Sequence, residues 1–238
     1  MINRKQFDIS AYFVVGPENT QNRPVAKIVK DAIDGGFTCI QIRSKIASAV
    51  EMIQLTKEVA DIISKANKSN EVTLLVNDRL DVILAGRKQG IKIDGIHVGQ
   101  SDIPVDVCRE YLGDDSIIGL SARTHELYEY IQSVDTHHLD YFGVGPLHET
   151  KTKIDCGLGL DGKVATRNLS ELIELAKLSS IPIVVGGGVK IDDIPSLAQT
   201  GVDGFFVVSA ISEQENPKLA ASNLVKAWKH HNLNKTNN

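Results

Sequence analysis

The chain has 238 residues, a length that suits a single α/β barrel domain. Hydrophobic residues make up 42% and charged residues 24% of it, the balance of a folded protein with a buried core rather than of a disordered chain. The formal net charge of -4, with no Lys- or Arg-rich run, argues against nucleic acid or an anionic membrane as a partner. An anionic ligand must therefore be bound by local groups.

The cysteines and the N-terminal segment bear on the cellular compartment. Cys39, Cys108 and Cys156 are an odd number without CxxC spacing, so neither a disulfide framework nor a cysteine zinc site is expected. The N-terminal segment lacks an apolar signal core, and no stretch approaches the roughly 18 apolar residues of a spanning helix. We expect a cytoplasmic protein, and the sequence leaves open whether it forms a homo-oligomer.

Short β-branched runs alternate along the chain with longer amphipathic segments. Strands are predicted at residues 11–16, 38–43, 73–77, 95–99, 116–121, 141–145, 182–187 and 204–209. Helices are predicted at residues 25–34, 49–65, 81–89, 104–111, 125–133, 169–178, 194–200 and 217–231. Eight strand–helix repeats predict an α/β protein with a single (β/α)8 TIM barrel.

A doubly wound open sheet is the alternative fold. It usually has fewer strands, and no GxGxxG motif follows the first predicted strand here. Several strands are apolar nearly throughout, as expected where helices cover one face and barrel side chains fill the other. No linker divides the chain, so we expect one catalytic domain at residues 1–231 and a disordered polar tail at 232–238.

Catalytic groups of such barrels lie at the carboxyl ends of the strands. The second predicted strand ends in Gln41, Arg43 and Lys45, which alternation places on one side of the chain. Arginine binds phosphate oxygens bidentately and lysine adds a compact charge, so this trio suits a diphosphate or triphosphate group. The alternative is a solvated strand end.

Two carboxylates follow neighbouring predicted strands, Asp78 after the third and Asp102 after the fourth. Together they could hold Mg²⁺, which takes one or two carboxylates along with water and substrate phosphate oxygens. The alternative is that Asp78 caps the next helix and Asp102 opens a turn before Pro104.

The fifth and sixth predicted strands lead into further polar groups. The fifth ends at Ser121, and the sixth is followed by a loop that contains Thr150, Thr152 and Lys153. Hydroxyls and a cation in such a loop would stabilise a departing pyrophosphate, an effect that grows as charge develops. The alternative is a merely polar loop.

The seventh and eighth predicted strands indicate a phosphate cradle. Residues 186–188 are all glycine, which lets the backbone approach a ligand closely, and the eighth strand ends in Val208 and Ser209. The loops at this place in a TIM barrel often bind a monophosphate through backbone N–H groups. The histidines show no zinc spacing, and we expect His97 to be a structural hydrogen-bonding residue inside the barrel. No nucleophile is assigned.

Seven segments in order resemble the signatures of the thiamine phosphate synthase family. They are QIRSK (41–45), NDRLD (77–81), GIHVGQSD (95–102), GLSARTHE (119–126), DYFGVGPLHETKTK (140–153), IPIVVGGG (181–188) and GVDGFFVVSAI (201–211). The resemblance implies a transferase that joins 4-amino-2-methyl-5-hydroxymethylpyrimidine diphosphate to hydroxyethylthiazole phosphate by a dissociative, Mg²⁺-assisted substitution. Thiamine phosphate and pyrophosphate are the implied products.

The resemblance also implies roles for individual residues of this chain. The Mg²⁺ ion would be held by Asp78 and Asp102, and catalysis would depend on Arg43, Ser121 and Lys153. The pyrimidine diphosphate would contact Gln41, Arg43, Lys45, Asn77, Ser121 and Lys153. The thiazole phosphate would contact Thr150, Thr152, Gly188, Val208 and Ser209.

The chain departs from the family pattern at two places. Gly186 stands where the family usually has an apolar residue, and His148-Glu149 replace an apolar-proline approach to the threonines. The second change resembles the thiazole tautomerases, which would not need the paired carboxylates or the diphosphate-binding set. A barrel that binds a thiamine precursor without catalysis is a further alternative.

Overall fold

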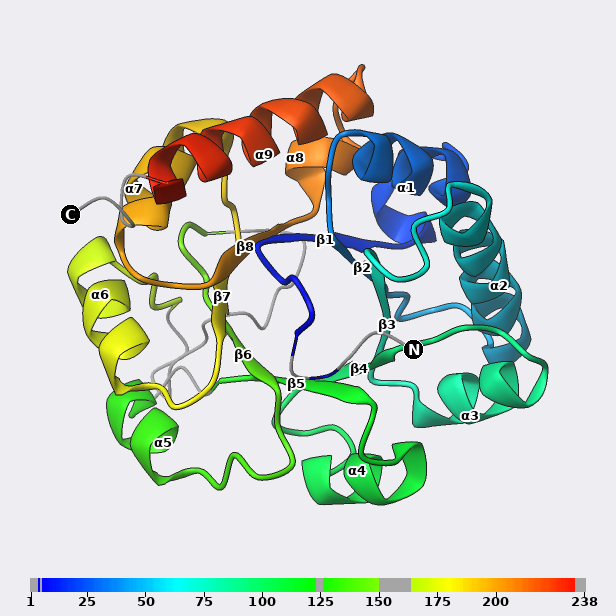
Figure 1. Cartoon of the computed structure of the whole chain (residues 1–238), viewed down its shortest axis with the longest axis horizontal. Coiled ribbons are helices and arrows are strands. Elements are labelled where there is room, and N and C mark those ends of the chain that lie inside the picture. Colours follow the sequence, from blue (N-terminus) through cyan, green and yellow to red (C-terminus); the bar gives the residue numbers. More distant parts are fainter. Residues whose placement is uncertain (1–3, 5, 123–125, 150–163, 234–238) are drawn as a thin grey trace.

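The computed structural model describes residue 4 and residues 6–122, 126–149 and 164–233. Its strands form one closed parallel barrel in chain order, in which β8 pairs back onto β1 (Figure 1). The strands are β1 (Ala11–Val15), β2 (Cys39–Ile42), β3 (Thr73–Asn77), β4 (Gly95–Val98), β5 (Ile117–Ser121), β6 (Tyr141–Val144), β7 (Ile183–Val185) and β8 (Gly204–Val207). The predicted (β/α)8 TIM barrel is confirmed.

Helices surround the barrel as an outer ring (Figure 1). They are α1 (Val25–Asp34), α2 (Ala49–Lys65), α3 (Leu80–Lys88), α4 (Val105–Leu112), α5 (Leu127–Ser133), α6 (Leu169–Leu178), α7 (Ile194–Gln199), α8 (Ser209–Ser212) and α9 (Pro217–Leu233), with 3-10 turns η1 (Pro17–Asn19) and η2 (Ile191–Asp193). The bounds predicted for α1, α2 and α6 are confirmed, whereas α8 was not predicted. No helix among the described residues has the length and apolar character needed to cross a membrane.

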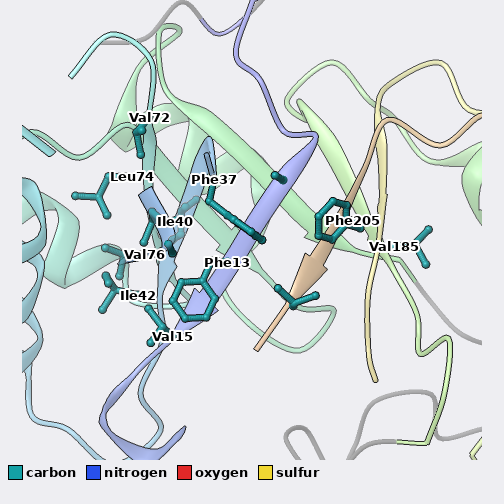
Figure 2. Packing of buried hydrophobic residues seen from close by; sticks show 14 of the residues in the cluster. Phe13, Val15, Phe37, Ile40, Ile42, Val72, Leu74, Val76, Val185 and Phe205 are labelled. Atoms are coloured by element: carbon teal, nitrogen blue, oxygen red, sulfur yellow. The ribbon is translucent and has the colours of Figure 1, made fainter. Parts of the chain in front are cut away.

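Alternate strand residues enter two separate apolar layers. The outward layer packs beneath the helices, and Figure 2 shows Phe37 against β1 and β8. The Phe37 ring lies edge-on to Phe13 and Phe205, with centroids 6.3 Å and 5.8 Å away. The inward layer is a smaller buried cluster: Ile9, Tyr12, Val14, Cys39, Leu75, Ile117, Tyr141 and Val184. Because alternate residues point to opposite faces, the polar residues between outward-facing ones must enter the barrel.

The N-terminal segment closes the end of the barrel where the strands begin. It crosses the barrel opening before entering β1 (Figure 1). Phe7 packs against Tyr141 with ring centroids 6.1 Å apart, and the Arg4 guanidinium donates a hydrogen bond to the Asp140 carboxylate. Asp140 also accepts from the Arg109 guanidinium over 2.9 Å. Packing and ion pairs thus hold the described part of this segment against the barrel, at the end opposite the loops that follow the strands.

Candidate active site

The carboxyl ends of β2 and β3 bring three of the predicted site residues together. The Lys45 ammonium donates to the Asp78 carboxylate over 2.6 Å, and the Asn77 amide donates to the same oxygen over 2.5 Å. Asn77 is buried, whereas the Lys45 side chain is 56% exposed. Within the described part of the chain, the half-buried Arg43 guanidinium forms no hydrogen bond or ion pair, so it is available to a ligand.

Glu18, a residue that the sequence analysis missed, positions the loop that carries Lys45. Its Oε1 accepts from the Ser44 hydroxyl over 2.7 Å and from the Lys45 backbone N–H over 2.8 Å. Burial acts to raise the pKa of Glu18, but hydrogen bonds from Ser44 and from backbone N–H groups hold that pKa below its ordinary value. A carboxylate in the loop after the first strand was the available signal, since βα loops carry functional groups.

Asp78 and Asp102 form a pair of adjacent carboxyl groups. Asp78 has φ of 59°, an unusual left-handed conformation for a residue other than glycine, and it does not cap α3. The Asp102 carboxylate accepts from the Gly99 N–H over 2.7 Å. Burial raises the pKa of Asp78 and the neighbouring Asp102 raises it further, while Lys45 acts in the opposite direction. The pair therefore carries a charge repulsion that a bound cation would relieve.

Gln41 and Ser121 face the barrel interior from β2 and β5. Gln41 is 3% exposed and donates from Nε2 to the Tyr12 hydroxyl, a contact that the sequence did not predict. The Ser121 hydroxyl lies 3.0 Å from Nε2 of His97. The expectation that His97 is a hydrogen-bonding residue within the barrel is confirmed. Both predicted substrate contacts thus form hydrogen bonds with side chains inside the barrel.

The loops after β7 and β8 contain a left-handed glycine and the start of a short helix. Gly188 has φ of 74°, and a Cβ there would lie 2.8 Å from Cβ of His148, so this position requires glycine. Val208 precedes α8, and Ser209 is its first residue. The first N–H groups of a helix have no partner inside that helix, which leaves them able to bind an anion. The short α8 is the element that the sequence analysis overlooked here.

Three of the predicted phosphate ligands lie outside the described residues. They are Thr150, Thr152 and Lys153, which belong to the segment between His148-Glu149 and the start of α6. Every other predicted site residue falls in the described part of the chain, at or just after the carboxyl end of a strand. The site therefore has the placement that active sites of TIM barrels share.

Comparison with known proteins decides the family. A family model described as thiamine monophosphate synthase matches residues 11–211. The chain belongs to the thiamine monophosphate synthase family. The resemblance drawn from its motifs is therefore confirmed, and the chain is an enzyme of the transferase class.

Relatives within the thiamine monophosphate synthase family align over nearly the whole chain. The thiamine-phosphate synthase of Methanobrevibacter smithii is 35% identical over 94% of this chain and 98% of its own. That of Corynebacterium efficiens is 37% identical over 93% and 95%, respectively. A solved thiamine phosphate pyrophosphorylase from Pyrococcus furiosus superposes with a TM-score of 0.75 at 27% identity, covering 96% of this chain and 98% of that one.

More distant barrels share the architecture only. A solved 3-hexulose-6-phosphate synthase from Salmonella typhimurium superposes with a TM-score of 0.62 at 16% identity, over 94% of this chain and 100% of that one. At such identity the likeness shows the fold and carries no argument about the reaction.

The structure shows the surroundings of Gly186 and His148, two residues that depart from the synthase pattern. At Gly186 a Cβ would lie 2.1 Å from the Phe206 ring, so the space of the usual apolar side chain is filled from β8. His148 places Nε2 2.9 Å from the Asp193 carboxylate, which also accepts from the Lys190 backbone N–H. His148 thus connects the loop after β6 to the turn before α7.

The described cysteines are packing residues. Cys39 and Cys108 are buried and form no disulfide. Burial raises the pKa of the Cys39 thiol well above its ordinary value, and it raises that of Cys108 to about 11. Neither thiol is a nucleophile at neutral pH, because the thiolate is the reactive form.

Proposed function

We propose that this enzyme joins 4-amino-2-methyl-5-hydroxymethylpyrimidine diphosphate to hydroxyethylthiazole phosphate, giving thiamine phosphate and pyrophosphate. The observation that carries the proposal is the cluster of Lys45, Asn77, Asp78 and Asp102 beside the inward-facing Gln41. It combines a cation, an amide and paired carboxylates at adjacent strand ends, which is a suitable arrangement for a metal-bound diphosphate. Family membership supports the reaction type.

Mg²⁺ fits the residues that are present. Asp78 and Asp102 supply two carboxylates, and the described residues contain no group of three or more His, Cys, Asp and Glu side chains that would make a closed protein cage. Magnesium needs no such cage, since it retains water and takes phosphate oxygens from the substrate. When bound, the ion would neutralise the negative charge that builds up on the departing diphosphate.

The proposed substitution is dissociative and needs no covalent enzyme intermediate. The bond between the pyrimidine methylene carbon and the diphosphate oxygen breaks, and its electron pair leaves with the diphosphate. The thiazole nitrogen then donates its lone pair to form the new C–N bond. We assign the contacts with the departing diphosphate to Arg43, Lys45, Ser121 and Lys153. Such a reaction needs only that the substrates are positioned and that the charge on the diphosphate is stabilised.

The second substrate would lie on the other side of the barrel mouth. We assign its phosphate to Gly188, Val208 and Ser209, with Thr150 and Thr152, which lie outside the described residues, closing over it. Gly188 in its left-handed conformation and the start of α8 support this assignment. We place the enzyme in the cytoplasm, where its thiols would stay reduced.

The test is an assay of the purified chain with both substrates and Mg²⁺, in which thiamine phosphate and pyrophosphate are followed by chromatography. We expect the two products in equal amounts, loss of activity with EDTA, and recovery with excess Mg²⁺. Asp78→Asn should lower kcat at least about a hundredfold, because it removes a charged ligand from the site. The matched control is Asp81→Asn, which should leave kcat unchanged, because Asp81 is an exposed carboxylate three residues further along the chain that pairs with Arg79.

Other outcomes would change the assignment. Isomerisation of the thiazole phosphate alone would indicate a tautomerase, and binding of both compounds without turnover would indicate a non-catalytic barrel. Full activity in chelator would exclude the proposed role of Asp78 and Asp102 as metal ligands.

A further inference from the structure

A continuous chain of hydrogen bonds crosses the barrel interior between two proposed substrate contacts. It begins at Gln41 on β2, whose Nε2 donates to the Tyr12 hydroxyl. The Tyr12 and Tyr141 hydroxyls lie 2.9 Å apart, and the Tyr141 hydroxyl lies 2.9 Å from Nδ1 of His97. Nε2 of His97 completes the chain, 3.0 Å from the Ser121 hydroxyl on β5.

The two tyrosines in the middle of this chain are sealed from solvent and stay protonated. Tyr12 is 1% exposed and Tyr141 0%. Burial raises the pKa of both phenols well above the ordinary value, so each hydroxyl keeps its one hydrogen at any pH at which the protein functions. Each tyrosine can therefore donate only one hydrogen bond. The direction of one hydrogen bond in the chain thus determines the direction of its neighbour.

The order of the hydrogens follows from the first contact. Because the Tyr12 oxygen accepts from Gln41, its own hydrogen must go to Tyr141. Tyr141 then donates to Nδ1 of His97, which must be the unprotonated nitrogen. The hydrogen of the neutral imidazole is consequently on Nε2 and is donated to Ser121.

The opposite order leaves a buried donor without an acceptor. If Nδ1 of His97 donated to Tyr141, then Tyr141 would donate to Tyr12, which already accepts from Gln41. The Tyr12 hydrogen would then have no acceptor among the described residues, and an unsatisfied buried hydroxyl is costly. Only the order from Gln41 to Ser121 gives the hydrogens of Tyr12, Tyr141 and the His97 imidazole an acceptor each among the described residues.

We propose that Tyr12, Tyr141 and His97 are positioning residues that fix the hydrogen-bonding sense of Gln41 and Ser121. The Gln41 amide is held by its Nε2, which leaves its carbonyl oxygen as the acceptor for substrate. The Ser121 oxygen is occupied by the His97 N–H, so its hydroxyl hydrogen is left to donate to substrate. This inference rests on the proposed function, in which Gln41 and Ser121 contact the pyrimidine diphosphate.

The tautomer of His97 tests the order of hydrogens without any substrate. In ¹⁵N-labelled protein at neutral pH, two-bond ¹⁵N–¹H correlations should show His97 neutral and protonated on Nε2; His97→Gln identifies its signals. A hydrogen on Nδ1, or an imidazolium with both nitrogens protonated, would overturn the proposal.

The functional consequence is tested by Tyr141→Phe, which keeps the ring and removes the central hydroxyl. We expect kcat/KM for the pyrimidine diphosphate to fall about tenfold, the loss of one or two neutral hydrogen bonds, while KM for the thiazole phosphate stays within about twofold. Tyr111→Phe removes an exposed hydroxyl elsewhere and should leave both constants unchanged. The double variant Tyr12→Phe/Tyr141→Phe, which leaves neither phenol to be satisfied, serves if Tyr141→Phe melts too early to assay.

The outcomes separate this inference from the proposed function. An inactive wild-type chain would contradict the proposed function before any variant is made. An active wild type together with Tyr141→Phe and double variants that retain wild-type kcat/KM would contradict the positioning role alone. A rise in KM for the thiazole phosphate as large as that for the pyrimidine diphosphate would also contradict it, because it would indicate a general structural defect.

Discussion

Phe206 explains why the chain has glycine at position 186, where the family usually has an apolar residue. Gly186 follows β7, and the Phe206 ring of β8 occupies the space where its side chain would be. The centroids of the Phe206 and Tyr12 rings are 6.1 Å apart, so Phe206 also packs beside the hydrogen-bond chain that contains Tyr12. Glycine at position 186 is thus required by the volume of Phe206 and not by a special backbone angle.

The contact between position 186 and the Phe206 ring can be tested by substitution. Gly186→Ala should destabilise the wild-type protein by about 1–3 kcal/mol, because a methyl group there overlaps the Phe206 ring. In a Phe206→Ala background, Gly186→Ala should leave the free energy of unfolding almost unchanged. Urea denaturation of the four proteins measures this double-mutant cycle. Equal costs in the two backgrounds would show that something other than Phe206 dictates the glycine.

The placement of a candidate site residue could be predicted from the sequence where it follows from strand position. Gln41 and Ser121 were expected at strand ends, and the structure brings Asp78 together with Asp102 as the sequence analysis required. Tyr12 and Tyr141 were missed because an aromatic residue in an apolar strand is ordinary packing. Their partners come from strands far apart in the sequence, so only the closed barrel reveals them.

At the scale of elements, α2 is a helix whose predicted start coincides with a capping signal in the sequence. α2 begins after Ser48, whose hydroxyl accepts from the Glu51 N–H over 3.3 Å, while the Glu51 carboxylate accepts from the Ser48 N–H over 2.8 Å. This reciprocal capping box satisfies N–H groups that a helix start would otherwise leave open. By contrast, α8 has four residues, too few for a helical period to be recognised.

The capping box predicts a local contribution to stability. Ser48→Ala should destabilise the protein by about 1 kcal/mol, since it removes one side of the box. Ser64→Ala is the matched control in the same helix, at an exposed position near its end, and should be neutral or slightly stabilising because alanine favours helix. Thermal unfolding of both variants by circular dichroism distinguishes them. A loss with Ser64→Ala equal to that with Ser48→Ala would contradict the capping role.

At the scale of the whole molecule, the two ends of the barrel have separate tasks. The carboxyl end of the strands carries the proposed chemistry, and its placement could be predicted from the strand–helix repeat. The amino end carries buried carboxylates that accept N–H groups of the preceding strand: Asp94 from Leu74 over 2.8 Å, and Asp140 from Ile118 over 2.8 Å. This arrangement was not predicted, because an aspartate before a strand resembles any turn residue.

Asp140 should be the most important of these carboxylates for stability. It accepts the Ile118 N–H and also forms a buried ion pair with Arg109, both side chains being about 5% exposed. Asp203 accepts the Ile183 N–H over 2.8 Å in the same way, but it is exposed and forms no ion pair with a described residue. Asp203→Ala is therefore the matched control.

Asp140→Ala should lower the free energy of unfolding by about 3–5 kcal/mol, because it leaves the charge of a buried guanidinium uncompensated, against about 1 kcal/mol for Asp203→Ala. Urea midpoints followed by circular dichroism give both values. Equal costs would mean that the strand N–H, and not the ion pair, is what the carboxylate contributes at this end of the barrel.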